Sequence, residues 1–370
     1  MPDTHPPAQC ISTDQIFFAS SALIEARERR EDARDRLLRI VDSGKYQAWY
    51  NGGTMELRPF APASDVGSGV LEELGLVKDG QLRVKINLVG ESLMLTDGVW
   101  VDSDIRVFPF SDESAAISKY CCRRNLLERA DLVIDLATGS GHNLAWFRRD
   151  VRGVGMDINP RALSYFHLNN VINGLSNRTG VLNDIRRGIS NIVDGADTPN
   201  ILILGNLPFG LAPTQRTLPF TSNGGETGVD LQGAALAAIA AFMRTKFGAR
   251  ARAVLLGYSV GNSTDGQWQV LDLARAMLPE HELGFSILDD EGLTRVDGRR
   301  VLANPSPVRM ALQAAGACRL YHQDTDRAQA LYASLSDRLV SRGFSDLAYV
   351  VLEIGPVQRV LESGRQSVDS

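Results

Sequence analysis

The stretch Asp131–Pro160, DLVIDLATGSGHNLAWFRRDVRGVGMDINP, decides the fold class of this 370-residue chain. It opens with an apolar run that ends at Asp135 and continues into a loop of small residues, Ala137-Thr138-Gly139-Ser140-Gly141. A predicted helix at 142–149 separates this loop from a second apolar run, which ends at Asp157. This order predicts a strand, a glycine loop, a helix and a second strand, the unit with which parallel α/β sheets hold a nucleoside.

The composition of the loop predicts a ligand other than a dinucleotide. The fingerprint G-x-G-x-x-G is incomplete, because His142-Asn143-Leu144 follow Gly141. A carboxylate at Asp135 would repel a pyrophosphate, whereas it suits a ligand that carries a cation. The glycines allow the backbone to come close to a ligand. Asp157 is placed to accept hydrogen bonds from ribose hydroxyls.

The loop and the two acids resemble the first two motifs of class I methyltransferases that depend on S-adenosylmethionine (AdoMet). The resemblance implies AdoMet as the cofactor, with Asp135 on the methionine ammonium and Asp157 on the ribose. It also implies that Ile158 packs on the adenine face and that Asp184 contacts the adenine amino group. The implied cofactor-binding residues are Asp135, Ala137, Thr138, Gly139, Gly141, Asp157, Ile158, Asp184 and Asn206.

A second motif, Asn206-Leu207-Pro208-Phe209, follows an apolar run at 200–204. It resembles the (Asn/Asp)-Pro-Pro-(Tyr/Phe) motif of methyltransferases that modify a planar nitrogen, and its Asn-Leu-Pro-aromatic form occurs in rRNA adenine dimethyltransferases. An Asn oxygen can accept hydrogen bonds from an NH2 group, proline fixes the turn, and the ring offers a stacking face. The resemblance therefore implies catalytic roles for Asn206, Pro208 and Phe209.

The same resemblance extends over residues 107–260. Gly224–Leu231, GGETGVDL, resembles the segment after the fourth strand of HemK-like protein-glutamine methyltransferases. Leu207 departs from their pattern, because those members have proline there. Residues 107–114 loosely resemble their Pro-Arg-x-(Glu/Asp)-Thr segment but lack its arginine. The resemblance thus supports the cofactor and the reaction type, while the acceptor stays open among a protein glutamine, a nucleobase and a small metabolite.

From Asp131 onward, apolar strand patterns alternate with helical ones, which predicts an α/β fold with a doubly wound, mostly parallel, seven-stranded Rossmann-like sheet. The expected strands are 132–135, 153–157, 179–183, 200–204, 252–257, 282–288 and 347–354. The expected helices are 142–149, 160–172, 229–246, 267–277 and 326–342. Residues 111–370 are the predicted catalytic domain, which opens with a helix at 111–128.

The N-terminal part predicts a different organisation. Residues 1–12 contain three prolines and predict a disordered tail. Residues 13–110 predict an α+β accessory domain, either a lid or a substrate-recognition domain, with a helix over 14–47 and short strands that include 55–58 and 82–88.

Charge and cysteine usage limit the class of partner. The formal net charge of −5 disfavours binding to nucleic acid, because proteins that bind its phosphate backbone usually carry a basic face. The four cysteines and five histidines show neither a disulfide framework nor metal-ligand spacing, so no metal is expected. The sequence contains no apolar run of about 20 residues that could cross a bilayer. A protein or small-molecule acceptor and a cytoplasmic location are the expectation.

Three alternatives stay open at this level. Gly257-Tyr258-Ser259-Val260-Gly261 matches the Gly-x-Ser-x-Gly elbow of serine hydrolases, and Asp289, Asp297 and His322 follow in the right order. That elbow needs a helix directly after the serine, whereas 261–266 predicts a loop. A closed pocket could let the amine of AdoMet attack its own carbon chain, as in azetidine-2-carboxylate-forming relatives of the class I fold. A non-catalytic AdoMet-binding subunit is disfavoured by the Asn206 turn.

Overall fold

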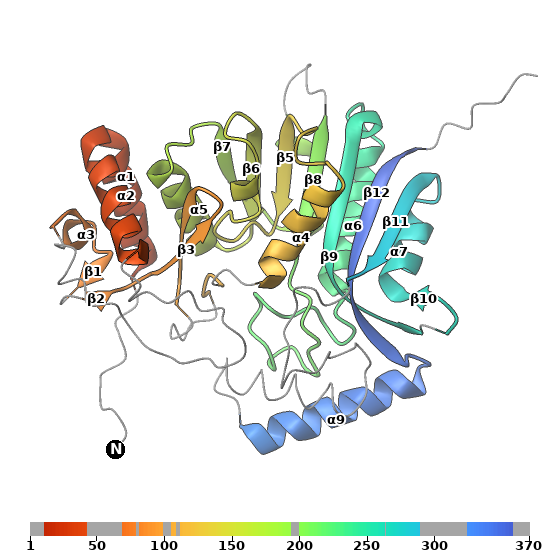
Figure 1. Cartoon of the computed structure of the whole chain (residues 1–370). Helices are drawn as coiled ribbons and strands as arrows, with labels where there is room; N and C mark the ends of the chain where they lie inside the picture. The colour runs from red at the N-terminus through yellow and green to blue at the C-terminus, as the bar shows by residue number, and fades with distance from the viewer. Residues whose placement is uncertain are drawn as a thin grey trace, which may run out of the picture.

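The computed structural model of the chain describes residues 11–42, 69–78, 81–98, 105–108, 112–193, 200–262, 264–288 and 324–357 (Figure 1). Its centre is a sheet with the strand order β11-β12-β9-β8-β5-β6-β7, and the short β10 pairs with the end of β9. The strands are β5 (Leu132–Leu136), β6 (Arg152–Asp157), β7 (Arg178–Leu182), β8 (Ile201–Asn206), β9 (Ala251–Asn262), β10 (Gln267–Trp268), β11 (His281–Ile287) and β12 (Asp346–Val357).

The sheet is parallel from β7 to β9, and β12 runs antiparallel to both of its neighbours, β9 and β11. Strands of a parallel sheet are covered on both faces, which explains their continuous apolar sequences. Every residue of β5 is buried, and so is 201–205 of β8. The predicted doubly wound α/β fold with seven main strands is confirmed.

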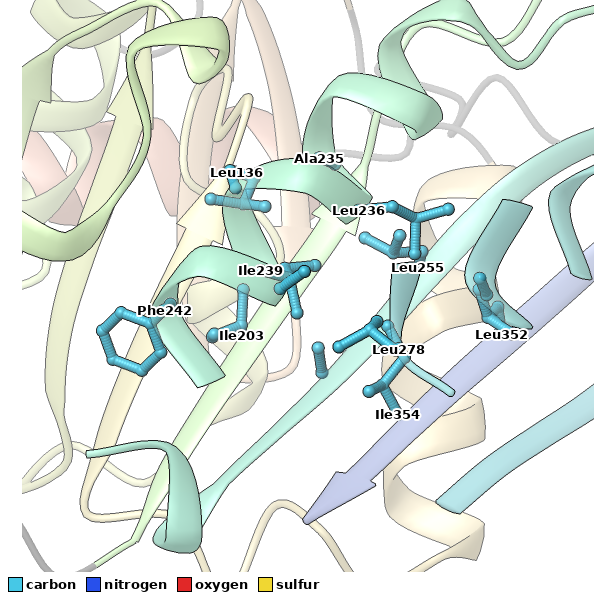
Figure 2. Close-up of a cluster of buried hydrophobic side chains, with 14 of the residues drawn as sticks. Leu136, Ile203, Ala235, Leu236, Ile239, Phe242, Leu255, Leu278, Leu352 and Ile354 are labelled. Carbon is cyan, nitrogen blue, oxygen red and sulfur yellow. The ribbon is translucent and has the colours of Figure 1, made fainter. Parts of the chain in front are cut away.

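Helices cover both faces of the sheet. The helices are α4 (Asp112–Arg123), α5 (Pro160–Ile172), α6 (Asp230–Met243), α7 (Gln269–Met277) and α9 (Thr325–Ser341). Figure 2 shows one face, where Ile203, Leu255 and Ile354 of the sheet meet the apolar side chains of α6 and Leu278. Val133, Leu202 and Val254 point to the other face, where they pack with Ile117 of α4 and Phe166 of α5.

The N-terminal segment packs on the far side of α5. It contains α1 (Thr13–Glu25), α2 (Arg27–Asp42), α3 (Gly69–Glu73), β1 (Val77–Lys78), β2 (Gln81–Leu82), β3 (Lys85–Val89) and β4 (Ser92–Thr96), in which β1–β2 and β3–β4 are antiparallel hairpins. Its apolar core includes Tyr165, Leu168 and Ile172 of α5. Helix α5 is therefore shared between the sheet and the N-terminal segment.

Several predicted boundaries are wrong, for local reasons. The helix predicted at 142–149 is only a 3-10 turn, Leu144–Trp146, because the Asn143 side chain is bonded to the end of β5. The single helix predicted over 14–47 is broken at Ala26, which is extended. The helix predicted at 111–128 ends at Arg123, and Asn125 takes a positive φ of 56° that stops it.

Three further differences concern short segments. Residues 267 and 268 form β10 rather than the start of a helix. Of the predicted tail, Ile11 is fully buried, and Ser12 caps α1 in a capping box with Gln15. The strand predicted at 55–58 lies outside the described residues.

Candidate active site

The predicted site residues gather at one edge of the sheet. Because β5, β6, β7 and β8 are parallel neighbours, the loops that follow them meet at their carboxyl ends. Asp157 and Asn206 are the last residues of β6 and β8, and the glycine loop follows β5 between them. Asp184 lies two residues beyond the end of β7. This edge is the candidate active site.

The glycine loop after β5 turns through left-handed backbone conformations. Ala137, Gly139 and Gly141 have φ values of 53°, 56° and 91°. A Cβ on Gly141 would lie 2.6 Å from the Phe166 ring, so the loop rests directly on α5 at this point. A Cβ on Gly139 would meet nothing within 4 Å, so this part of the loop borders open space. The two glycines therefore serve different purposes.

We expect Gly139→Ala to remove ligand binding at modest cost to folding, and Gly141→Ala to destabilise the fold. A left-handed alanine costs about 1–2 kcal/mol, and at Gly141 the collision with Phe166 adds roughly 1–3 kcal/mol. Chemical denaturation and calorimetry with AdoMet measure the two effects. Equal losses of stability in both variants would contradict the assignment of open space at Gly139.

Asp157 fastens the loop to β6. Its Oδ2 accepts a hydrogen bond from the Gly139 amide (2.8 Å), and its Oδ1 accepts one from the Asn159 amide (2.8 Å). Burial raises the pKa of this carboxyl, against the lowering effect of the backbone donors. An ionised carboxylate offers about four acceptor sites, so acceptor capacity remains that ribose hydroxyls could use. The next residue, Ile158, has an exposed side chain.

Asp135 is fully buried at the end of β5. Its Oδ2 accepts from the Thr138 hydroxyl (2.7 Å), and its Oδ1 accepts from the Asn143 amide (2.9 Å). Burial raises the pKa of Asp135 to about 7. The Asn143 Oδ1 is buried and has no hydrogen-bond partner within the part of the chain that the structure describes. Asn143 was not predicted as a site residue, and only its position after the glycines could have indicated it.

Asp184 and its neighbour shape the loop after β7. The Asp184 Oδ1 accepts from the Arg186 amide (3.0 Å) and so caps the 3-10 turn Ile185–Arg187. The side-chain amide of Asn183 donates to the Gly188 carbonyl (2.9 Å). Asp184 is thus fixed by local turn chemistry, and the adenine contact that the resemblance implies for it stays a prediction.

The Asn206 turn is held by the glycine segment that follows it. The Gly210 amide donates to Ser222 O (2.8 Å), and the Gly224 amide donates to Gly210 O (2.9 Å). A Cβ on Gly224 would lie 2.6 Å from the Phe209 Cα, so only glycine lets the two segments touch. The Asn206 side-chain amide makes no hydrogen bond to any residue that the structure describes. It is half-buried and available to a ligand.

The Phe209 ring belongs to an aromatic cluster. It meets the Tyr258 ring nearly edge to face, with 4.9 Å between centroids and an interplanar angle of 80°. Its centroid lies 5.3 Å from that of Tyr349. Tyr258 and Tyr349 are direct partners across β9 and β12. The Phe209 ring is therefore held in contact with both tyrosines.

Helix α9 packs against the segment that follows the Asn206 turn (Figure 1). Tyr332 and Leu335 of α9 share an apolar cluster with Leu211, which lies just after the Asn206 turn. Arg338 and Arg342 form ion pairs with Glu226 of the glycine segment, at 2.6 and 3.2 Å. The sequence predicted this helix but gave no sign of where it packs.

The Gly-x-Ser-x-Gly match does not form a nucleophile elbow. Ser259 lies inside β9 and is fully buried. Its hydroxyl donates to Val260 O (3.1 Å) and accepts from the Val270 amide (3.2 Å). An elbow needs a strained turn between a strand and a helix, with the serine exposed. Asp289, Asp297 and His322 lie outside the described residues.

The described ranges carry no sign of a metal centre or of a membrane span. They contain no cluster of three or more His, Cys, Asp or Glu side chains that could hold a metal ion. They also contain no helix with the length and apolar character needed to span a membrane. His142 is half-buried beside the loop, and burial lowers its pKa to about 4.

Comparisons with known proteins gave structural similarities only. No protein-family model and no curated protein matches the chain. Trm5b from Pyrococcus abyssi is 16% identical with a TM-score of 0.34, over 56% of this chain and 49% of that one, so the chain spans about half of its length. The [4+2]-cyclase SpnF is 13% identical (TM-score 0.36; 64% and 80% covered). A SAM-dependent methyltransferase from Geobacter sulfurreducens, in complex with S-adenosyl-L-homocysteine, is 14% identical (TM-score 0.33; 64% and 90% covered).

Proposed function

We propose that the chain is an AdoMet-dependent methyltransferase that methylates a planar amide or amino nitrogen of a protein or a small molecule. One observation carries the proposal: the Asp157-bound glycine loop and the Asn206 turn meet at the carboxyl edge of three adjacent strands, β6, β5 and β8. A donor and an acceptor held by these two elements would lie side by side.

The residues at this edge fit AdoMet. The open space at Gly139 accommodates a ligand close to the backbone, and Asp157 offers acceptors for a ribose. The unpartnered Oδ1 of Asn143, one amide away from Asp135, suits a ligand ammonium. When bound, AdoMet supplies a methyl group on a sulfonium that is already activated for transfer.

The contribution of the protein to the reaction is then positioning. The Asn206 side-chain oxygen, which no described residue occupies, would accept a hydrogen bond from the acceptor NH2 group and aim its nitrogen. Pro208 fixes the turn, and Phe209 bounds the acceptor position from its aromatic cluster. A nitrogen that loses its proton only after attack needs no general base. The aspartates of the site therefore bind and orient without taking part in proton transfer.

Mass spectrometry of the purified protein with AdoMet tests the proposal. Incubation with AdoMet alone should leave it bound and intact, and addition of glutamine-containing peptides, nucleobases or small amines should yield S-adenosylhomocysteine and a methylated acceptor. Release of methylthioadenosine without an acceptor would instead identify AdoMet itself as the substrate, the intramolecular alternative. Failure of AdoMet to bind in calorimetry would overturn both.

We expect AdoMet affinity to rise as the pH increases from 5.5 to 7.5. Burial raises the pKa of Asp135 to about 7, so Asp135 is largely protonated at the lower pH. Only the ionised carboxylate strengthens the attraction of the neighbouring Asn143 oxygen for the ligand ammonium. The expected gain is about tenfold. Calorimetry over this range measures the gain in affinity. Asp135→Asn should reduce the dependence of AdoMet affinity on pH without removing it, because burial also raises the pKa of Asp157.

The stability of the ligand-free protein should change in the opposite sense. The unfolded pKa of an aspartate is about 3.9, so the folded chain takes up a proton at Asp135 between that value and about 7. The contribution of Asp135 to stability is therefore present at low pH and is lost as the pH rises through this window. If stability and AdoMet affinity both rise with pH in the wild type, and both profiles are the same in Asp135→Asn, the role given to Asp135 is wrong.

A further inference from the structure

Two asparagines, Asn169 within α5 and Asn173 at its C-cap, act in place of a neighbouring strand for β4. The Asn169 side chain pairs with both backbone groups of Leu95, as acceptor from its N–H (2.8 Å) and donor to its carbonyl (3.0 Å). Asn173 pairs in the same way with Leu93, at 3.0 and 2.7 Å. Four residues along a helix rise about 6 Å, and two strand residues span about 6.7 Å, so the two pairs match in spacing.

The two asparagines differ in their third hydrogen bond. The Asn169 Nδ2 also donates to the carbonyl of Ser140 in the glycine loop (3.0 Å), whereas the Asn173 Nδ2 donates to Asn169 O in its own helix (2.8 Å). Ser140 is buried between Gly139 and Gly141. A single buried amide group therefore holds the glycine loop and the β3–β4 hairpin together.

The end of the same hairpin is fixed to the start of α5. Asp97, one residue after β4, is fully buried and forms an ion pair with Arg161, with an Nε–Oδ2 distance of 2.8 Å. The Tyr165 hydroxyl donates to the same carboxylate (2.9 Å). The Asn159 side chain, two residues after Asp157, donates to Ile105 O (2.8 Å). The hairpin and the residues after it are thus anchored next to both halves of the nucleoside site.

We infer that Asn169 is a positioning residue of the AdoMet site, through which the β3–β4 hairpin sets the conformation of the glycine loop. The inference rests on the proposed function. The Asn169 side-chain amide fixes the Ser140 carbonyl between two left-handed glycines. Phe166, on the same face of α5, supports the loop at Gly141. Because coupling between two sites is reciprocal, AdoMet on the loop would in turn order the hairpin.

Asn169→Asp and Asn173→Asp make a matched pair of variants. Each is isosteric, keeps an acceptor for the β4 amide, and turns a donor into an oxygen that faces two carbonyl groups. Only the Asn169 change reaches the glycine loop. With similar losses of Tm, we expect Asn169→Asp to raise the AdoMet Kd by at least about tenfold and Asn173→Asp to change it by less than about threefold. Calorimetry with AdoMet and with S-adenosylhomocysteine measures both.

Hydrogen exchange on the wild-type full chain gives a second test that needs no variant. The Leu95 amide should exchange several-fold more slowly when AdoMet is bound, because its partner Asn169 also holds the occupied loop. Equal effects of the two variants on Kd, or an unchanged Leu95 rate in protein that binds AdoMet, would overturn the inference alone. Absence of AdoMet binding to the wild type would overturn the proposed function and the inference with it.

Discussion

Replacement of Asp157 by alanine should raise the AdoMet dissociation constant at least about a hundredfold. The change removes the acceptors for the ribose and leaves the Gly139 and Asn159 amides without their partners. A hydrogen bond to a charged acceptor contributes roughly 1.5–3 kcal/mol, and about 2.7 kcal/mol corresponds to a hundredfold change in affinity. Calorimetry with AdoMet gives the affinity, and thermal unfolding gives the cost to the fold.

Two variants complete this experiment. Asp150→Ala removes a carboxylate whose side chain is 75% exposed on the loop just before β6, and it should leave AdoMet affinity unchanged. Asp157→Asn keeps the shape of the side chain and one acceptor oxygen, and it should give an intermediate loss. If Asp157→Ala binds AdoMet as tightly as the wild type does, the ribose does not bind at Asp157.

Asn206→Ala should strongly reduce turnover and leave AdoMet binding within about threefold of the wild-type value. The Asn206 side chain makes no bond within the described ranges, so its loss costs the fold little. Its side chain would orient the acceptor, and loss of an orienting group at the reacting atom can lower kcat by roughly a hundredfold to a thousandfold. Formation of S-adenosylhomocysteine with the identified acceptor measures the rate.

Ser259→Ala is the matched control for that experiment. Ser259 is buried in β9, in the Gly-x-Ser-x-Gly match, and its loss should reduce stability through the Val270 amide while kcat and AdoMet affinity stay as in the wild type. A loss of AdoMet affinity as large as the loss of kcat in Asn206→Ala would instead make Asn206 a donor-binding residue. A fully active Asn206→Ala protein would place the acceptor elsewhere.

The part of the fold that the sequence predicts well is local or uniformly buried. Helix α5 has the predicted bounds, because Pro160 follows a capping Asn159, whose side chain accepts from the Arg161 amide, and Gly174 lies just beyond its end. Strand β5 was recognisable because a strand covered on both faces is continuously apolar and here ends at an acid. The predictions for the glycine loop, Asp157 and the Asn206 turn rest on the same kind of local signal.

The rest of the site depends on contacts between distant residues. Asn169 reads as an ordinary polar position on a helix, and its partner Leu95 is 74 residues away in the sequence. Glu226 and Arg338 are separated by 112 residues. Asn143 turns back to Asp135 and so replaces a predicted helix by a tight turn. Periodicity and motif spacing contain no information on such pairs.

The place of β12 in the sheet affects how the chain can assemble during synthesis. β12 lies between β9 and β11, although the ribosome makes it after both. A nascent chain that has not yet reached Asp346 exposes the bare edges of β9 and β11, whose hydrogen-bonding groups have no strand to pair with. Unpaired edges of this kind invite pairing between chains. Closure of the sheet is therefore a late event in biogenesis, and a chain released before β12 is complete would be a substrate for chaperones rather than a shorter folded protein.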